Sequence, residues 1–195
     1  MKGNFCGRWK NKDEVITIVK MNQTYHCTFE KSNIGIVFQD TLLISAFDED
    51  AQVGGVGVYS PIGDGVANYA LWSSTKIAGL LGSGITQKAD GKKELCGNYT
   101  VDYLVHGKEA GSFALHISAV KDCDVYHLVW YAEDKAVLHG IGLMDGENLA
   151  FAWGSRGCSF DFTMLKFCGA EDNLLIKSAV KMDDEKIDMG ILLRG

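Results

Sequence analysis

The stretch Thr24-Tyr25-His26-Cys27-Thr28-Phe29 recurs later in the chain as Val125-Tyr126-His127-Leu128-Val129-Trp130. In the first copy, large or apolar side chains alternate with polar ones, as they do along a strand with one buried face. The second copy keeps the Tyr-His pair and the final aromatic residue. The two segments therefore predict equivalent β-strands in two related parts of the chain.

Three further matches occur in the same order along the chain. They pair Cys6-Gly7-Arg8-Trp9 with Cys96-Gly97-Asn98-Tyr99, Ile34-Gly35-Ile36 with Ile141-Gly142-Leu143, and residues 55–59 with 157–163. Ordered matches of this kind are typical of an internal duplication. We predict a first repeat over 4–86, a connection over 87–94 and a second repeat over 95–195. We expect one continuous body, because pairing the repeats covers the sheet edges that each would leave open.

Glycine is abundant and proline nearly absent, with 23 and 1 among 195 residues. Glycine stands beside aspartate at Gly63-Asp64-Gly65, Asp90-Gly91 and Asp145-Gly146, and such pairs favour tight hairpin turns. Short apolar runs between closely spaced turns are typical of antiparallel barrels and sandwiches. The sequence therefore predicts an all-β fold, an antiparallel barrel or barrel-like sandwich built from two diverged repeats. Evidence for helix is confined to 75–81 and 178–189, and the second segment reads equally well as a strand and an acidic loop.

The second repeat carries a pattern that resembles the repeats of a loosely defined set of uncharacterised bacterial β-proteins. The residues that carry it are Gly97-Asn98-Tyr99, 126–130, Gly140-Ile141-Gly142-Leu143, Asp145-Gly146 and Leu149-Ala150-Phe151-Ala152. The resemblance covers most of the chain and implies no activity.

The opening Gly7-Arg8-Trp9 also resembles the G-x-W start of the calycins, the lipocalin and avidin barrels. In those families the tryptophan closes one end of the barrel. The resemblance implies a calycin-like barrel in which Trp9 has that position, although Tyr99 at the parallel site departs from the motif.

The charge of the chain limits its partners. The net charge is −6 and no run of lysine or arginine occurs, which argues against nucleic-acid binding and polybasic attachment to a membrane surface. No apolar stretch reaches the roughly 18 residues of a membrane span. The N-terminus lacks the apolar run of a signal peptide, so we expect a cytoplasmic protein, with non-classical export as an open alternative.

No metal or cofactor motif is evident. The six cysteines form no C-x-x-C pair, and we expect reduced, mostly buried thiols. His26 and His127 occupy parallel positions, but no third ligand has a predictable place. The acidic clusters at 48–50 and 183–185 lack calcium-loop spacing, so the sequence predicts neither a cofactor nor a metal.

No catalytic motif is evident either, and the sequence favours a non-enzymatic binding or interaction module. The ordinary interpretation of the aromatic residues on strands is that they fill a barrel or sandwich core. The more specific hypothesis is an aromatic-lined cavity at a barrel mouth that could hold a small apolar ligand. The candidate ligand-binding residues are Tyr25, Phe29, Tyr126, Trp130 and Trp153. The alternative functions are a hydrolase-type enzyme with dispersed catalytic residues and an exported effector acting on a protein partner. The sequence leaves the oligomeric state open.

Overall fold

The chain is all-β in the computed structural model. The model describes residues 4–11, 14–28, 31–48, 51–77, 79–120, 124–168, 173–181 and 187–194. Within these ranges every strand pairing is antiparallel, and the helical structure is one 3₁₀ turn, η1 (Thr75–Ile77). The predicted all-β antiparallel class is confirmed, and the segment around 178–189 forms strand on both sides of its undescribed part.

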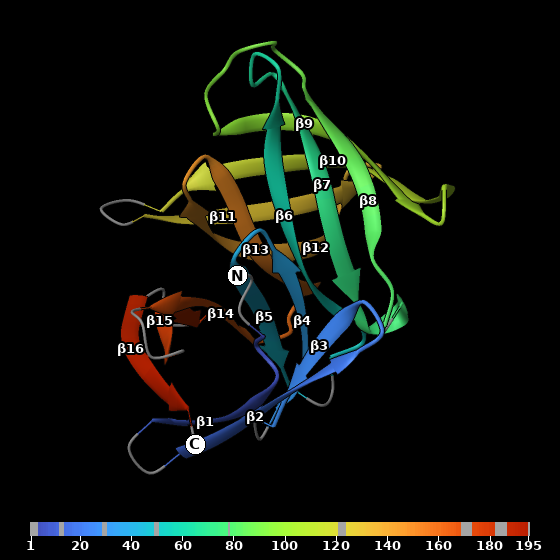
Figure 1. Cartoon of the computed structure of the whole chain (residues 1–195). Coiled ribbons are helices and arrows are strands. Elements are labelled where there is room, and N and C mark those ends of the chain that lie inside the picture. The colour runs from blue at the N-terminus through green and yellow to red at the C-terminus, as the bar shows by residue number, and fades with distance from the viewer. Residues whose placement is uncertain are drawn as a thin grey trace.

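The strands close into two eight-stranded barrels, which lie one above the other in Figure 1. Barrel A consists of β1 (Gly7–Asn11), β2 (Glu14–Met21), β3 (Thr24–Cys27), β4 (Ser32–Phe38), β5 (Thr41–Phe47), β14 (Phe160–Cys168), β15 (Asn173–Lys181) and β16 (Ile187–Arg194). Barrel B consists of β6 (Gly54–Ile62), β7 (Ala67–Ser74), β8 (Gly82–Lys88), β9 (Gly97–Val105), β10 (Lys108–Ala119), β11 (Val125–Ala132), β12 (Lys135–Asp145) and β13 (Asn148–Ser155). Closure leaves neither sheet with a free edge, which removes the hazard of edge-to-edge association.

The two parts of the chain exchange strands. The part up to β8 supplies β1–β5 to barrel A and β6–β8 to barrel B, and the part from β9 onward supplies β9–β13 to barrel B and β14–β16 to barrel A. Each barrel therefore contains five strands from one part and three from the other. Neither barrel can close without both parts of the chain.

The two barrels also share their strand register. Trp9 pairs with Ile16 in barrel A, as Tyr99 pairs with Leu115 in barrel B. Tyr25 pairs with Gly35 as Tyr126 pairs with Gly142. The segments that match in sequence thus occupy equivalent places in the two barrels.

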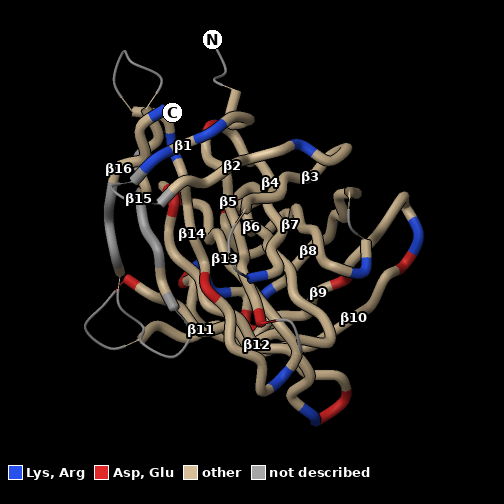
Figure 2. Tube along the Cα trace, turned by 90° about the horizontal axis from the view of Figure 1, so that it is seen from below, with Lys and Arg blue, Asp and Glu red and all other residues tan. Residues whose placement is uncertain are grey.

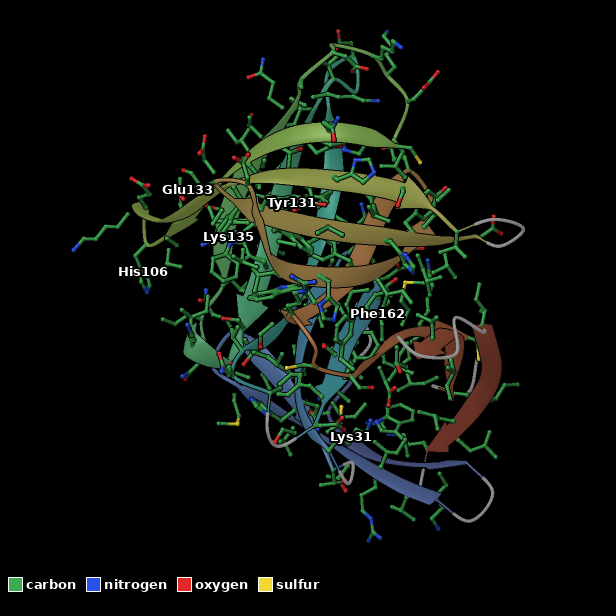
Figure 3. All side chains as sticks on the ribbon, turned by 180° about the vertical axis from the view of Figure 1, so that it is seen from behind. Lys31, His106, Tyr131, Glu133, Lys135 and Phe162 are labelled. Carbon is green, nitrogen blue, oxygen red and sulfur yellow. The ribbon has the colours of Figure 1, made fainter. Side chains whose placement is uncertain are left out.

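A shared core joins the barrels along β4, β5, β6 and β13. All seven residues of β5 are buried, because its alternate side chains face two different cores. Leu42 and Ile44 pack inside barrel A, while Leu43 packs against residues of barrel B such as Val56 and Ala150. Phe162 belongs to the same shared core and lies where the two barrels meet in Figure 3.

Glycines have two separate roles in this fold. Gly146 has a φ of 65° in the turn between β12 and β13, as the Asp-Gly pair predicts. Inside barrel B, glycines instead leave room for aromatic rings. A Cβ on Gly57 would lie 2.6 Å from the ring of Phe151, and one on Gly140 would lie 3.0 Å from the ring of Trp130. The sequence pattern identified the turn glycines and missed the second group.

Charged residues are scattered over both barrels. Figure 2 shows lysine and arginine interspersed with aspartate and glutamate along the trace, without one continuous basic stripe. None of the helical structure in the described ranges is long and apolar enough to cross a membrane.

Candidate ligand cavity at the mouth of barrel B

One end of barrel B is closed. Lys88 and Tyr99 face each other across the β8–β9 pair that closes the barrel, and they are 4% and 3% exposed. The Lys88 ammonium donates hydrogen bonds to the carbonyls of Glu94 and Cys96 and lies 5.7 Å from the centre of the Tyr99 ring. The Tyr99 hydroxyl donates to the Leu95 carbonyl over 2.7 Å. The connection between β8 and β9 is thereby fastened across this end.

The same arrangement closes barrel A. Trp9 is fully buried, and its indole N–H donates to the Phe5 carbonyl over 2.9 Å. The Arg194 guanidinium lies 5.5 Å from the centre of the Trp9 ring. Trp9 pairs with Arg194 across β1 and β16, as Tyr99 pairs with Lys88 across β9 and β8.

The opposite end of barrel B contains a cavity of about 390 Å³. Its walls come from the ends of β7, β9, β11 and β13, the starts of β10 and β12, and η1. The lining residues are Val53, Trp72, Ser74, Lys76, Ile77, Tyr103, Val105, Ala110, Phe113, Trp130, Ala132, Val137, Leu138 and Trp153. Because Lys76 and Ala110 are exposed, the cavity reaches the surface at the barrel mouth.

Five aromatic side chains form the inner wall of this cavity. The centre of the Trp72 ring lies 5.4 Å from the centre of the Tyr103 ring and 6.5 Å from that of the Trp153 ring, and both pairs meet edge to face. Trp130 lies 6.4 Å from Trp153, and Phe113 lies 6.1 Å from Tyr103. These separations are in the range of favourable aromatic pairs, so the rings support one another and keep the hollow open.

A small polar network lies at the floor of the cavity. The Trp130 indole N–H donates to the Tyr103 hydroxyl over 2.9 Å, and that hydroxyl is 2.5 Å from the hydroxyl of Tyr59. Burial raises the pKa of Tyr59 and of Tyr103 well above the usual 10, so both phenols keep their protons at neutral pH.

Two hairpins of barrel B carry polar side chains. Figure 3 shows His106 in the β9–β10 turn and Glu133 and Lys135 in the β11–β12 hairpin on the same side of barrel B. Lys76 is the charged residue of the lining. Among the described lining residues, Lys76 and Tyr103 are the titratable ones.

The described residues of barrel A form a buried core. A tightly buried cluster with Trp9, Ile18, Leu42 and Leu165 occupies its interior, and Phe167 packs against this cluster. A second cavity, of about 330 Å³, is lined by His26, residues of β4, Phe47 of β5 and Thr75 of η1.

The structure brings together two of the five predicted ligand-binding residues. Trp130 and Trp153 both line the cavity. Tyr126 lies on β11 with Trp130 and packs against the same core, but it is absent from the lining. Four residues of strand separate the two side chains by about 13 Å, so Tyr126 lies deeper along the barrel. Tyr25 packs in barrel A, and Phe29 lies outside the described residues.

Sequence reasoning missed Trp72, Tyr103 and Phe113. Tyr103 continues the inward phase of Tyr99 and Val101 on β9, and this alternation is a signal that points to it. Phe113 follows the same phase on β10. The strand that carries Trp72 has no repeat match that assigns it to a barrel, so its place in the cavity depends on the strand exchange.

The described residues contain no group of three His, Cys, Asp or Glu side chains that could hold a metal. The predicted equivalence of His26 and His127 agrees with their places on β3 and β11. Cys6, Cys27, Cys96, Cys158 and Cys168 are free thiols. Only Cys27 of these is buried, which corrects the expectation of mostly buried thiols.

Comparison of the chain with protein-family models, with curated proteins and with solved structures finds no match. The resemblances to the calycins and to the bacterial repeat proteins therefore remain predictions from sequence.

Proposed function

We propose that the chain is a non-enzymatic binding protein that holds a small apolar ligand in the mouth of barrel B. The observation that carries the proposal is the aromatic-lined cavity at the mouth of barrel B, which reaches the surface beside Lys76 and Ala110. Its volume is within the range of small-molecule sites, roughly 300–1,000 Å³.

The chemistry of the lining supports an apolar ligand. Three indole rings, Trp72, Trp130 and Trp153, offer flat apolar surface to the cavity. Transfer of apolar ligand surface into this site is favourable by roughly 25 cal/mol per Å². The described lining contains no carboxylate or histidine that could act with Lys76 or Tyr103 as an acid–base pair, so binding accounts for the site better than catalysis.

A neutral fluorescent dye tests the proposal. N-phenyl-1-naphthylamine gains fluorescence in apolar sites, and we expect saturable binding to the native protein. Ala132 lines the cavity, so Ala132→Trp should fill it and weaken dye binding at least tenfold. Ala114 lies on the exposed side of β10, so Ala114→Trp adds the same side chain outside the cavity and should leave binding unchanged.

Two results would contradict the proposal. One is a native protein that does not bind the dye. The other is equal loss of binding in both tryptophan variants, since that would place the dye elsewhere.

A further inference from the structure

Three hydrogen-bond donors meet at the cavity floor. They are the Trp130 indole N–H and the hydroxyls of Tyr59 and Tyr103, and two hydrogen bonds join them. Each bond uses one hydrogen. One hydroxyl hydrogen is therefore left without an acceptor within the trio, and the described residues offer neither hydroxyl another hydrogen bond.

Burial decides which hydroxyl keeps the spare hydrogen. Tyr59 is 1% exposed and its ring is stacked 4.5 Å from Phe151, so a spare hydrogen on Tyr59 would be enclosed without an acceptor. An enclosed donor without an acceptor is unfavourable, because it loses its hydrogen bond to water and gains none in return. Tyr103 lines the cavity. The favoured arrangement has Tyr59 donating to Tyr103, while the Tyr103 hydrogen points into the hollow.

We infer that the ligand carries an uncharged oxygen acceptor, such as a carbonyl oxygen, which accepts a hydrogen bond from the Tyr103 hydroxyl at the cavity floor. This inference rests on the proposed function. The remainder of the ligand lies between the rings of Trp72, Trp130 and Trp153.

The acceptor is uncharged because the floor contains no compensating cation. The positive side chain of the described lining, Lys76, lies at the exposed rim. A carboxylate at the floor would be buried without a counter-charge, and this is far more costly than burying a neutral carbonyl.

Two naphthalene probes of matched shape test the inference. 2-Acetylnaphthalene offers a carbonyl, and 2-isopropylnaphthalene replaces it with a hydrocarbon group of similar outline. If only the transfer of the probe out of water decided affinity, the protein would bind 2-isopropylnaphthalene more tightly than 2-acetylnaphthalene. We expect the Tyr103 bond to offset that preference, so that the native protein binds the ketone at least as tightly.

Two conservative variants separate the tyrosines. Tyr103→Phe removes the donor to the ketone and also the acceptor of Trp130 and Tyr59, which acts on both probes alike. The ratio of ketone to hydrocarbon affinity should therefore fall about fivefold, as expected for one hydrogen bond of ordinary strength. Tyr59→Phe leaves Tyr103 accepting from Trp130 and donating to the ligand, so ketone binding should stay the same.

The frequency of the carbonyl stretching band of bound 2-acetylnaphthalene reports directly whether its carbonyl oxygen accepts a hydrogen bond. We expect the band at lower frequency in the native protein and in Tyr59→Phe, and at the frequency of an apolar solvent in Tyr103→Phe. If Tyr103→Phe fails to fold, the native and Tyr59→Phe spectra still decide, because both must show the lowered frequency.

The outcomes distinguish this inference from the proposed function. If both probes bind but the ketone band is unshifted in the native protein, the acceptor contact is wrong and the apolar site stands. If neither probe binds, the proposed function fails and the inference fails with it.

Discussion

The Cys27 thiol is enclosed inside barrel A. The backbone N–H of Cys27 donates to the side-chain oxygen of Asn33 over 2.8 Å. Burial raises the pKa of the Cys27 thiol to about 12. The thiolate is the reactive form of cysteine. We therefore predict that iodoacetamide at neutral pH modifies Cys6, Cys96, Cys158 and Cys168 before Cys27, as followed by mass spectrometry of peptides. Modification of Cys27 at the rate of the half-buried thiols would contradict this burial.

Buried phenols make the fold sensitive to alkaline pH. Desolvation raises the pKa of Tyr99 to about 12, and it raises the pKa of Tyr59 and Tyr103 above the usual 10. In the unfolded chain these groups lose protons near pH 10, whereas in the folded protein they retain them. The stabilisation is complete below that pH and is lost as the pH rises toward the folded values.

We therefore predict a lower free energy of unfolding in urea at about pH 11 than at about pH 8. Tyr99→Phe removes one of the titrating groups, so its stability should fall less over the same interval. An identical fall in Tyr99→Phe would show that Tyr99 does not contribute.

At the scale of the strand, the inward glycines of barrel B make room for the aromatic wall. Gly57 faces the Phe151 ring, where a Cβ would lie 2.6 Å from the nearest ring atom. We predict that Gly57→Ala lowers the free energy of unfolding by about 1–3 kcal/mol, the usual cost of overpacking a core.

A double-mutant cycle in urea checks the cause. In a Phe151→Leu background the ring is gone, so adding Gly57→Ala should cost clearly less than it does in the native protein. Equal costs in the two backgrounds would mean that the glycine acts through its backbone alone.

Sequence patterns predicted strands best where one face is buried and the other is exposed. On β9, Tyr99 and Val101 are buried while Asn98 and Thr100 are exposed, and this alternation is legible in the sequence. On β5 this alternation of buried and exposed residues is absent, since barrel A covers one face of the strand and barrel B covers the other.

The candidate site could be predicted only in part. Alternation gives the face of a strand on which a side chain lies, and it placed Trp130 and Tyr126 on the same inward face of β11. It does not give depth along the barrel, which decides that Trp130 reaches the cavity and Tyr126 does not. It also cannot show which barrel β6–β8 or β14–β16 will join, because pairing between distant segments decides that.

At the scale of the whole molecule, strand exchange makes the two parts of the chain interdependent. Residues 91–94, between β8 and β9, are exposed. We predict that a protein cut at an engineered protease site beside Lys92 stays a single species on size-exclusion chromatography, since each barrel retains strands from both pieces. The same sample should resolve into two fragments in denaturant. Separation of the pieces under native conditions would contradict the exchanged topology.

The central claim is that an apolar ligand occupies the mouth of barrel B. The chain contains four tryptophans; three line the cavity, and Trp9 lies inside barrel A as an internal reference. The most direct measurement is the set of indole N–H signals in a ¹⁵N–¹H spectrum during titration with N-phenyl-1-naphthylamine. We predict that the signals of Trp72, Trp130 and Trp153 shift together to saturation while that of Trp9 stays in place. A shift confined to Trp9, or no shift in any of the four, would contradict the claim.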